Sequence, residues 1–370
     1  MSSRPAVSVV DVEEVRDRVD AVLAAHVSRE RALVATIGAD AAVLCDAITQ
    51  MLSGGKRLRA SLCYWSWRAH GGEAHGPGAD AVIAVGAALE LFQAAALFHD
   101  DVMDASDTRR GLPAAHRTFE ARHREQGWSG EAARYGESAA ILLGDLALVA
   151  SESTFARALS RLPARAATTA RDVFDLMRTQ VTVGQYLDVL AQALPWGADP
   201  VADEARAREV IRSKTARYSV EHPIVLGAAL AGADDDQLDA CRRLGLPLGE
   251  AFQLRDDLLG IFGDPAVTGK PAGDDLREGK RTVVVARAMH AGDAATRHLL
   301  ASRLGDRSMS TEDVAALAAA IEATGAPDDV EQLIAELAGT ARSELDAAQL
   351  ADPGADMLRR LAAAVVDRVA

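Results

Sequence analysis

Two pairs of aspartates, each at the end of an apolar stretch, are the residues best placed to do chemistry. Asp100 and Asp104 follow the run LELFQAAALF, and Asp256 with Asp257 follows a second apolar stretch. On a helix, residues four apart lie on one face, so the side chains of Asp100 and Asp104 would stack. Buried carboxylates are costly without a neutralising cation, and Mg²⁺ typically takes one or two protein carboxylates and leaves its other positions to water and phosphate oxygens. The pattern therefore predicts a Mg²⁺ site that receives a phosphorylated ligand.

Basic residues gather near these aspartates along the chain. Lys56 and Arg59 follow two glycines at an expected helix start, where free backbone N–H groups favour anions. A diphosphate suits such a set, because arginine binds its oxygens in a bidentate manner while the metal bridges carboxylate to phosphate. Any one of these cations could equally well be a surface residue in an ordinary ion pair, so the prediction of a diphosphate site rests on the whole set. Its other members follow the first aspartate pair, lie between the pairs, or follow the second pair: Arg109, Arg110, Lys214, Lys270, Lys280 and Arg281.

The elements that position these residues are expected to be helices. Alanine, leucine, glutamate and arginine dominate, aromatic residues are few, and long alternating β-branched runs are absent, so the predicted fold class is all-α. The helix that ends at Asp104 is apolar nearly all round, which is typical of a buried helix. A loop with a short helix is expected over 112–136. Other helices are expected over 11–37, 40–52, 60–65, 138–162, 172–194, 203–230 and 235–262, with about four more over 282–370.

Length and composition limit the class of protein. The 370 residues show no sharp linker, so we expect one domain over 1–370, with an N-terminal helix within 1–39 and C-terminal helices over 283–370 packed on the core. The formal net charge of −14 argues against nucleic acid as a partner. Three dispersed cysteines without a CxxC pair favour free thiols in a reducing cytoplasm. No signal-like segment is seen, and no uninterrupted apolar run reaches the ~18–20 residues of a transmembrane helix, so no stable membrane anchor is expected.

Four segments resemble the motifs of one enzyme family. They are GGKRLR (54–59), HDDVMDASDTRRG (99–111), KTARYS (214–219) and FQLRDDLLGIFGDPAVTGKPAGDDLREGKRT (252–282). In this order they are similar to the motifs of trans-isoprenyl diphosphate synthases, particularly the actinobacterial polyprenyl and geranylgeranyl diphosphate synthases. The similarity extends from about residue 40 to 290 and involves several motifs rather than one. It implies an all-α bundle around a central cavity, usually in a homodimer.

The resemblance also implies an activity and roles for individual residues. Isopentenyl diphosphate would be joined head-to-tail to an allylic diphosphate, with release of diphosphate. Asp100 and Asp104 would hold two Mg²⁺ ions and Asp256 a third, and these aspartates with Lys214 would be the catalytic residues. The residues implied for isopentenyl diphosphate are Lys56, Arg59, Gln93 and Arg110. Those implied for the allylic diphosphate are Arg109, Lys214, Thr215, Gln253, Lys270 and Lys280.

The chain departs from the family pattern at two positions. Gly260 stands where many members have a third aspartate. Either Asp264 or Asp274 would supply that carboxylate from farther along the chain, or the third carboxylate is dispensable. Gln93 replaces a histidine that is common in bacterial members, and it can still donate a hydrogen bond to a diphosphate.

Asp188 is interpreted in two ways, either as a residue that reaches the site or as a cap of a neighbouring element.

Product length is expected to depend on the helix before Asp100, because members of the family elongate the product along it. Ala95 and Ala96 lie about one turn below Asp100 and are small, so they should not stop a C15 chain. Phe92 lies two turns, or roughly 11–12 Å, below Asp100 and is the expected floor. These residues predict geranylgeranyl diphosphate, a C20 product, and longer products if Phe92 points aside.

Three alternatives remain open at this stage. A terpene cyclase also uses an aspartate-rich helix and Mg²⁺, but it does not need Lys56, Arg59 and Arg110 for a second diphosphate. A non-catalytic subunit of a heteromeric prenyl synthase tends to lose the aspartates, and both pairs are intact here. A helical scaffold with solvated acidic helix ends would bind no diphosphate.

Overall fold

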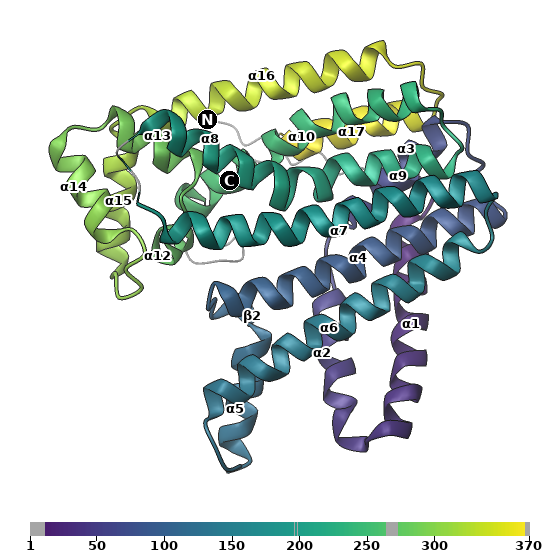
Figure 1. Cartoon of the computed structure of the whole chain (residues 1–370), viewed down its shortest axis with the longest axis horizontal. Helices are drawn as coiled ribbons and strands as arrows, with labels where there is room; N and C mark the ends of the chain where they lie inside the picture. The colour runs from purple at the N-terminus through teal and green to yellow at the C-terminus, as the bar shows by residue number, and fades with distance from the viewer. Residues whose placement is uncertain (1–11, 196, 198, 264–272, 367–370) are drawn as a thin grey trace.

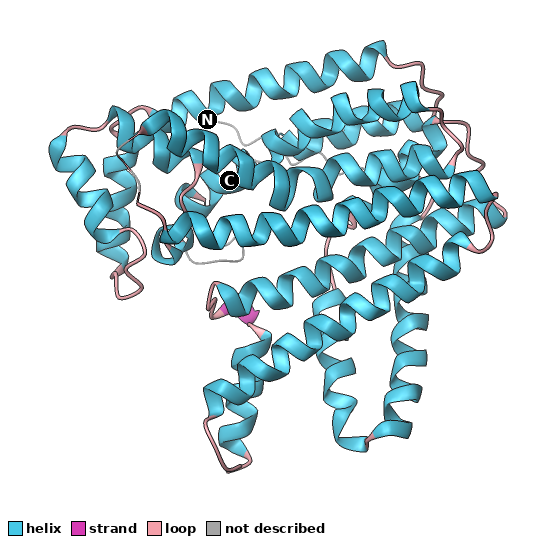
Figure 2. Cartoon of the chain, in the orientation of Figure 1, coloured by secondary structure: helices cyan, strands magenta, loops and turns pink. Residues whose placement is uncertain are grey.

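Helices make up nearly all of the regular secondary structure in the described residues, which confirms the predicted all-α class (Figure 2). The computed structural model describes residues 12–195, 197, 199–263 and 273–366. The first part of the chain contains α1 (Val15–Ile37), η1 (Ala39–Ala41), α2 (Ala42–Leu52), α3 (Leu58–Ala69), α4 (Pro77–Met103), the strands β1 (Thr108–Arg109) and β2 (Leu112–Pro113), α5 (Ala115–Glu125), α6 (Ala132–Leu159) and α7 (Ala164–Ala193). The second part contains α8 (Pro200–Val210), η2 (Ile211–Glu221), α9 (His222–Leu230), α10 (Asp235–Phe262), α12 (Asp274–Glu278), α13 (Val283–Ala291), α14 (Ala294–Arg303), α15 (Thr311–Glu322), α16 (Ala326–Ala347) and α17 (Gly354–Val366).

Helix α4 is the central helix of the fold, and it begins at Pro77, well before the run LELFQAAALF that indicated it. Proline suits the first turn of a helix because the N–H that it lacks has no intrahelical partner there. The helix is buried on nearly all sides, packs on α1, α3 and α6, and runs between α6 and α7 in Figure 1. It ends at Met103, so Asp100 lies in its last turn and Asp104 follows directly.

Two hydrophobic clusters share helix α10. The first surrounds α4 and includes side chains of α6 and α7, among them Phe155 and Phe174, whose rings stack at a centroid distance of 3.9 Å. The second lies among α8, α13, α15 and α16. Leu248 of α10 belongs to the first cluster and Leu254 to the second. Because burying one such side chain is worth about 1.5–3 kcal/mol, packing on both clusters holds α10 and the acidic end that it carries in place.

Helix η2, a π-helix, is packed closely between α7 and α10. A Cβ atom on Gly184 of α7 would lie 2.5 Å from the backbone N of Lys214, and one on Gly249 of α10 would lie 2.8 Å from the backbone C of Ala216. Only glycine permits such close approach of two backbones. Turns of π-helix are rare and are often found at functional sites. The two glycines thus allow η2 to hold Lys214 between helices that come from distant parts of the chain.

The structure corrects several predicted boundaries. Region 112–136 contains the second strand of a short antiparallel hairpin, helix α5 and the start of α6. The pattern did not indicate all of α5 because its sequence, AHRTFEARHRE, is mostly polar; ion pairs of Glu120 with Arg117 and Arg124 lie along it instead. The helix expected over 203–230 is divided into α8, η2 and α9, and α13 to α17 replace the four helices expected after residue 282. The single-domain organisation stays a prediction.

Two helices, α4 and α6, are long and apolar enough to span a membrane by length and composition. Uninterrupted apolar runs did not indicate these helices, because isolated charges such as Glu90 break the run of α4 without lowering its average hydropathy much. The expectation of no stable membrane anchor stays a prediction. The most apolar 18-residue window of α4 is 78% buried inside the protein, whereas that of α6 is 44% buried. Burial explains the apolar character of α4, but α6 leaves an apolar face exposed.

Candidate active site

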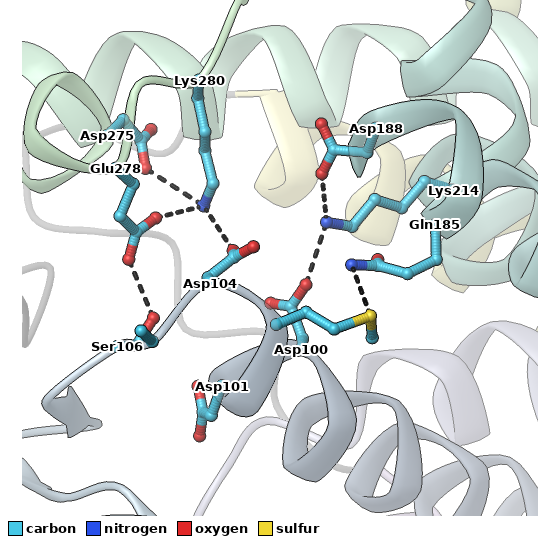
Figure 3. Close-up of polar contacts among 12 residues, drawn as sticks. Asp100, Asp101, Asp104, Ser106, Gln185, Asp188, Lys214, Asp275, Glu278 and Lys280 are labelled. Carbon is cyan, nitrogen blue, oxygen red and sulfur yellow. Dashed lines mark hydrogen bonds and ion pairs between the residues drawn. The ribbon is translucent and has the colours of Figure 1, made fainter. Parts of the chain in front are cut away.

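Lys214 joins two carboxylates at the end of the central helix. Its Nζ atom lies 2.9 Å from Asp100 Oδ1 and 2.6 Å from Asp188 Oδ2, so α4, η2 and α7 meet at this point (Figure 3). Burial acts to raise the pKa of Asp100, but nearby cations, Lys214 first among them, hold it well below its ordinary value. Burial likewise acts to lower the pKa of Lys214, and the charges of Asp100 and Asp188 raise it. Lys214 and Asp100 are therefore both charged at neutral pH.

Lys280 joins the first acidic motif to the segment that follows the second. Its Nζ atom lies 3.5 Å from Asp104 Oδ2, 3.4 Å from Asp275 Oδ1 and 2.7 Å from Glu278 Oε2. Ser106 Oγ donates to Glu278 Oε1 at 2.8 Å, which ties the same segment to the loop after α4. Figure 3 shows the three carboxylates converging on the ammonium group of Lys280.

Two carboxylates of the site are difficult to ionise. Burial and the charge of Asp100, which lies one turn away, raise the pKa of Asp104 to about 6. Burial also raises the pKa of Asp257 to about 8; Gln253, whose Nε2 donates to Asp257 Oδ1 at 2.8 Å, opposes this rise, and the charge of Asp275 adds to it. The raised values show that the surrounding cations do not fully compensate these carboxylates. A divalent cation would favour their ionised forms, so the site fits Mg²⁺.

The two predicted aspartate motifs lie at one site rather than on opposite surfaces. Lys280 contacts Asp104 of the first motif, and its positive charge opposes the burial that raises the pKa of Asp257 in the second. Asp256 is half-buried at the end of α10, and its charge raises the pKa of Asp257. Among the described residues, no three His, Cys, Asp or Glu side chains are grouped so as to hold a metal by themselves. A metal ion here would therefore complete its coordination with water and phosphate oxygens, as Mg²⁺ usually does.

A second group of cations lines a small pocket beside α4. Arg57, Glu90, Gln93 and Arg110 contribute to its wall, and it is a shallow depression that is partly open to solvent. Arg57 Nε donates to Asp20 Oδ1 at 2.7 Å, and its Nη1 lies 3.4 Å from Glu90 Oε2. Burial lowers the pKa of Arg110; Glu90 opposes this, and the positive charge of Arg57 adds to it. The structure thus brings the predicted Gln93 and Arg110 together in a pocket whose positive charge suits a diphosphate.

Arg59 points into the bundle instead. Its Nη2 donates to Tyr218 Oη at 2.6 Å and to Ser219 Oγ at 2.7 Å, and its guanidinium carbon lies 4.3 Å from the centroid of the Tyr218 ring. The Tyr218 ring meets Phe92 edge-to-face at a centroid distance of 6.0 Å. Arg59 therefore fixes an aromatic pair two helical turns below Asp100, and its predicted contact with isopentenyl diphosphate stays a prediction.

The other predicted site residues differ in how closely they approach the aspartates and lysines of the site. Arg109 Nη2 lies 3.5 Å from Asp100 Oδ2, so it belongs to the first acidic motif. Thr215 is half-buried, and Lys56 is exposed. Lys270 lies outside the described residues.

Four residues of the site were not predicted from the sequence: Arg57, Tyr218, Asp275 and Glu278. Asp275 and Glu278 are part of the segment DDLREGK, whose acidic residues precede Lys280 by five and two positions and so gave a usable signal. Arg57 lies in the quoted motif GGKRLR, but its φ of +51°, which turns the chain just before α3, is not visible in the sequence. Tyr218 is identified only by its tertiary contacts.

The buried carboxyl group of Asp257 predicts how stability depends on pH. Its pKa of about 8 in the folded protein exceeds the ~3.9 of an unfolded aspartate, so the unfolded chain loses this proton first as the pH rises. The contribution of this group to the free energy of unfolding therefore falls between pH 4 and pH 8. Asp257→Asn, measured by urea denaturation in EDTA, should gain stability relative to the wild type as the pH rises through that window. The exposed Asp328→Asn is the control, and parallel pH profiles for the wild type and Asp257→Asn would contradict the assignment.

Comparison with known proteins places the chain in a family. The model of the polyprenyl synthetase family matches residues 41–321. A geranylgeranyl diphosphate synthase from Mycobacterium tuberculosis is 33% identical over 309 residues, covering 80% of this chain and 79% of that protein. A nonaprenyl diphosphate synthase from the same organism is 31% identical over 330 residues, covering 88% of this chain and 85% of that protein.

A solved structure resembles the whole fold. The crystal structure of a geranylgeranyl pyrophosphate synthase from Corynebacterium glutamicum, complexed with isoprenyl diphosphate and magnesium, is 37% identical with a TM-score of 0.89. The match covers 97% of this chain and 100% of that one. Family model, relatives and structure agree with the resemblance in the motifs, so this chain belongs to the polyprenyl synthetase family and is a prenyltransferase that elongates trans-prenyl diphosphates.

Proposed function

We propose that this prenyltransferase uses Mg²⁺ to join isopentenyl diphosphate head-to-tail to an allylic diphosphate, and that geranylgeranyl diphosphate is its main product. One observation carries the proposal: Lys280 contacts Asp104 at the end of α4 and also Asp275, whose carboxylate lies against Gly260 near the end of α10. Lys214 contacts Asp100 in the last turn of α4. A separate cationic pocket, which includes Gln93 and Arg110, would take the second diphosphate.

The acidic centre is suited to bind the allylic diphosphate. Asp100 and Asp104 would hold two Mg²⁺ ions and Asp256 a third, and the bound ions would supply positive charge that stabilises the leaving diphosphate. Lys214 contacts two carboxylates and has a third N–H donor for a phosphate oxygen. Lys280 contacts three carboxylates, so it would donate to a phosphate oxygen once a bound cation takes over one of these partners. Their charges would therefore stabilise the negative charge that builds up as the allylic C–O bond breaks.

The apolar surroundings serve the next step. Ala95, about one turn before Asp100 on α4, is buried, and Ala96 is half-buried. Such side chains exclude water, which would otherwise capture the allylic cation. The double bond of isopentenyl diphosphate then attacks the cation, and the departing diphosphate is the expected acceptor of the proton that is lost.

An assay of the purified protein tests this function. With Mg²⁺, labelled isopentenyl diphosphate and a C5, C10 or C15 allylic starter, products sized by chromatography should be longer prenyl diphosphates. Asp100→Asn should lower turnover by about 100-fold or more, because even the partners of metal ligands are typically worth 10–100-fold. It should keep a wild-type circular dichroism spectrum. Asp328→Asn on α16 serves as the control, and near-wild-type turnover in Asp100→Asn would rule out the metal role given to this residue.

The aromatic pair Phe92–Tyr218 supports Phe92 as the floor for the growing chain. Phe92 is buried and lies two turns, or about 12 Å, below Asp100. Phe92→Ala should lengthen the product beyond C20 because it opens this floor. Ala95→Phe should shorten the product because it blocks the path one turn higher. Both effects are measured from the size distribution of the products. An unchanged distribution in both variants would contradict the assignment of Phe92 as the floor.

We also propose that the enzyme is a homodimer in which α6 packs against a second copy. Leu142 and Val149 are seven residues apart, so they lie on one face of α6; their exposed fractions are 62% and 65%. Exposed apolar patches of this kind mark protein–protein or membrane contacts.

All three cysteines are free, as expected for the cytoplasmic location that stays a prediction.

Sedimentation velocity distinguishes these contacts. The wild type should sediment as a dimer, and the double variant Leu142→Arg, Val149→Arg should shift toward the monomer, because each copy would place buried arginines against its partner. The exposed pair Ala315→Arg, Ala316→Arg on α15 is the matched control. A monomeric wild type that binds phospholipid vesicles through α6, or a double variant that remains a dimer, would contradict the proposal.

A further inference from the structure

The carboxylate of Asp275 fills the space beside Gly260 on α10. A Cβ atom added to Gly260 would overlap Asp275 Oδ2 and lie 2.6 Å from its Cγ. No side chain fits there without displacing the carboxylate, since real Cβ atoms do not approach other atoms so closely. The glycine of the second motif is therefore the residue that lets a carboxylate from α12 approach the backbone of α10.

The position of this carboxylate relative to the second motif follows from helix geometry. Residue 260 lies three positions after Asp257 and four after Asp256, so it occupies the next turn on the same face of α10. Asp275 is nearly buried, and its charge contributes to the raised pKa of Asp257. It thus adds a negative charge to the face of α10 that already carries both motif aspartates.

Asp275 also faces the centre of the site. Its Oδ1 lies 3.4 Å from Lys280 Nζ, the group that contacts Asp104 from the other acidic motif (Figure 3). Glu278 shares Lys280, but it accepts a hydrogen bond from Ser106 and so belongs to the side of the first motif. Of the two replacements expected from the sequence, Asp274 is not the residue against Gly260, and Asp264 lies outside the described residues.

Helix α12 is held firmly enough to position this side chain. Leu276, next to Asp275, is completely buried, and its backbone O accepts from the N–H of Gly305 at 2.9 Å. The helix is bounded by Gly273 and Gly279, with φ values of +67° and +78°, so left-handed turns define both of its ends. These contacts fix the position of Asp275 on α12.

We infer that Asp275 supplies, from α12, the carboxylate that α10 lacks at position 260, and that it acts with Asp256 on the third Mg²⁺ ion of the bound diphosphate. The inference rests on the proposed function, because it assigns a residue to the same metal-dependent site. It explains why Gly260 does not weaken the second motif: the carboxylate is present at the same place, attached to another element. Lys280, which pairs with Asp275 here, is then within reach of a phosphate oxygen once Asp275 contacts the metal.

An exchange of the two residues tests this inference. Binding of Mn²⁺ in the presence of inorganic diphosphate is measured by electron paramagnetic resonance, which counts bound ions without any turnover. Asp275→Asn should lose one bound Mn²⁺ ion or bind it about 10- to 100-fold more weakly. Gly260→Asp combined with Asp275→Gly should recover the wild-type number of ions, because the carboxylate returns to the same space from α10. Asp274→Asn, the adjacent residue of α12, is the matched control and should bind like the wild type.

The outcomes separate this inference from the proposed function. A wild type that binds no Mn²⁺ with diphosphate would contradict the proposed metal site itself. A wild type that binds three ions, with Asp275→Asn binding the same number equally tightly, would overturn only the role of Asp275. Thermal unfolding by circular dichroism shows whether each variant is folded. A folded exchange variant that fails to recover the ion would also overturn the inference.

Discussion

The fold depends on neutralising carboxylates that have been gathered at the buried end of a helix. Asp100 and Asp104 lie one turn apart, where two negative charges out of water repel each other strongly. Lys214 from η2 and Lys280 from the segment after α12 contact them directly. Each of these lysines also contacts a carboxylate from another element, Asp188 or Asp275. The charges of the site therefore join helices that are far apart in the sequence.

The same charges explain why this arrangement suits a ligand better than it suits the protein alone. Asp104 and Asp257 have raised pKa values, so keeping them ionised at neutral pH costs folding free energy. A cation and a diphosphate that bind only to the folded state would offset that cost and shift the equilibrium toward it. Active sites commonly lower the folding free energy of an enzyme in this way, because their side chains are arranged to bind the ligand and not to stabilise the protein.

Local motifs predicted the chemistry well, whereas tertiary contacts decided its details. The aspartate pairs, Gln93 and Arg110 were predicted because their residue types and spacing carry the signal in short segments. Arg59 was assigned to a diphosphate from its motif, yet it bonds to Tyr218, which is 159 residues away. Asp275 was missed because its role depends on how closely α12 approaches Gly260. No pattern along one segment encodes such a distance, which is set by packing of α10 and α12 on different parts of the core.

The most direct test of the central claim is a crystal structure of the enzyme with Mn²⁺ and inorganic diphosphate, with the metals located by anomalous scattering. The account predicts Mn²⁺ peaks between Asp100, Asp104 and Asp256 and the phosphate oxygens, with Lys214 and Lys280 turned from carboxylate to phosphate. Metal peaks away from these aspartates, or diphosphate bound while both lysines keep their present carboxylate partners, would contradict it.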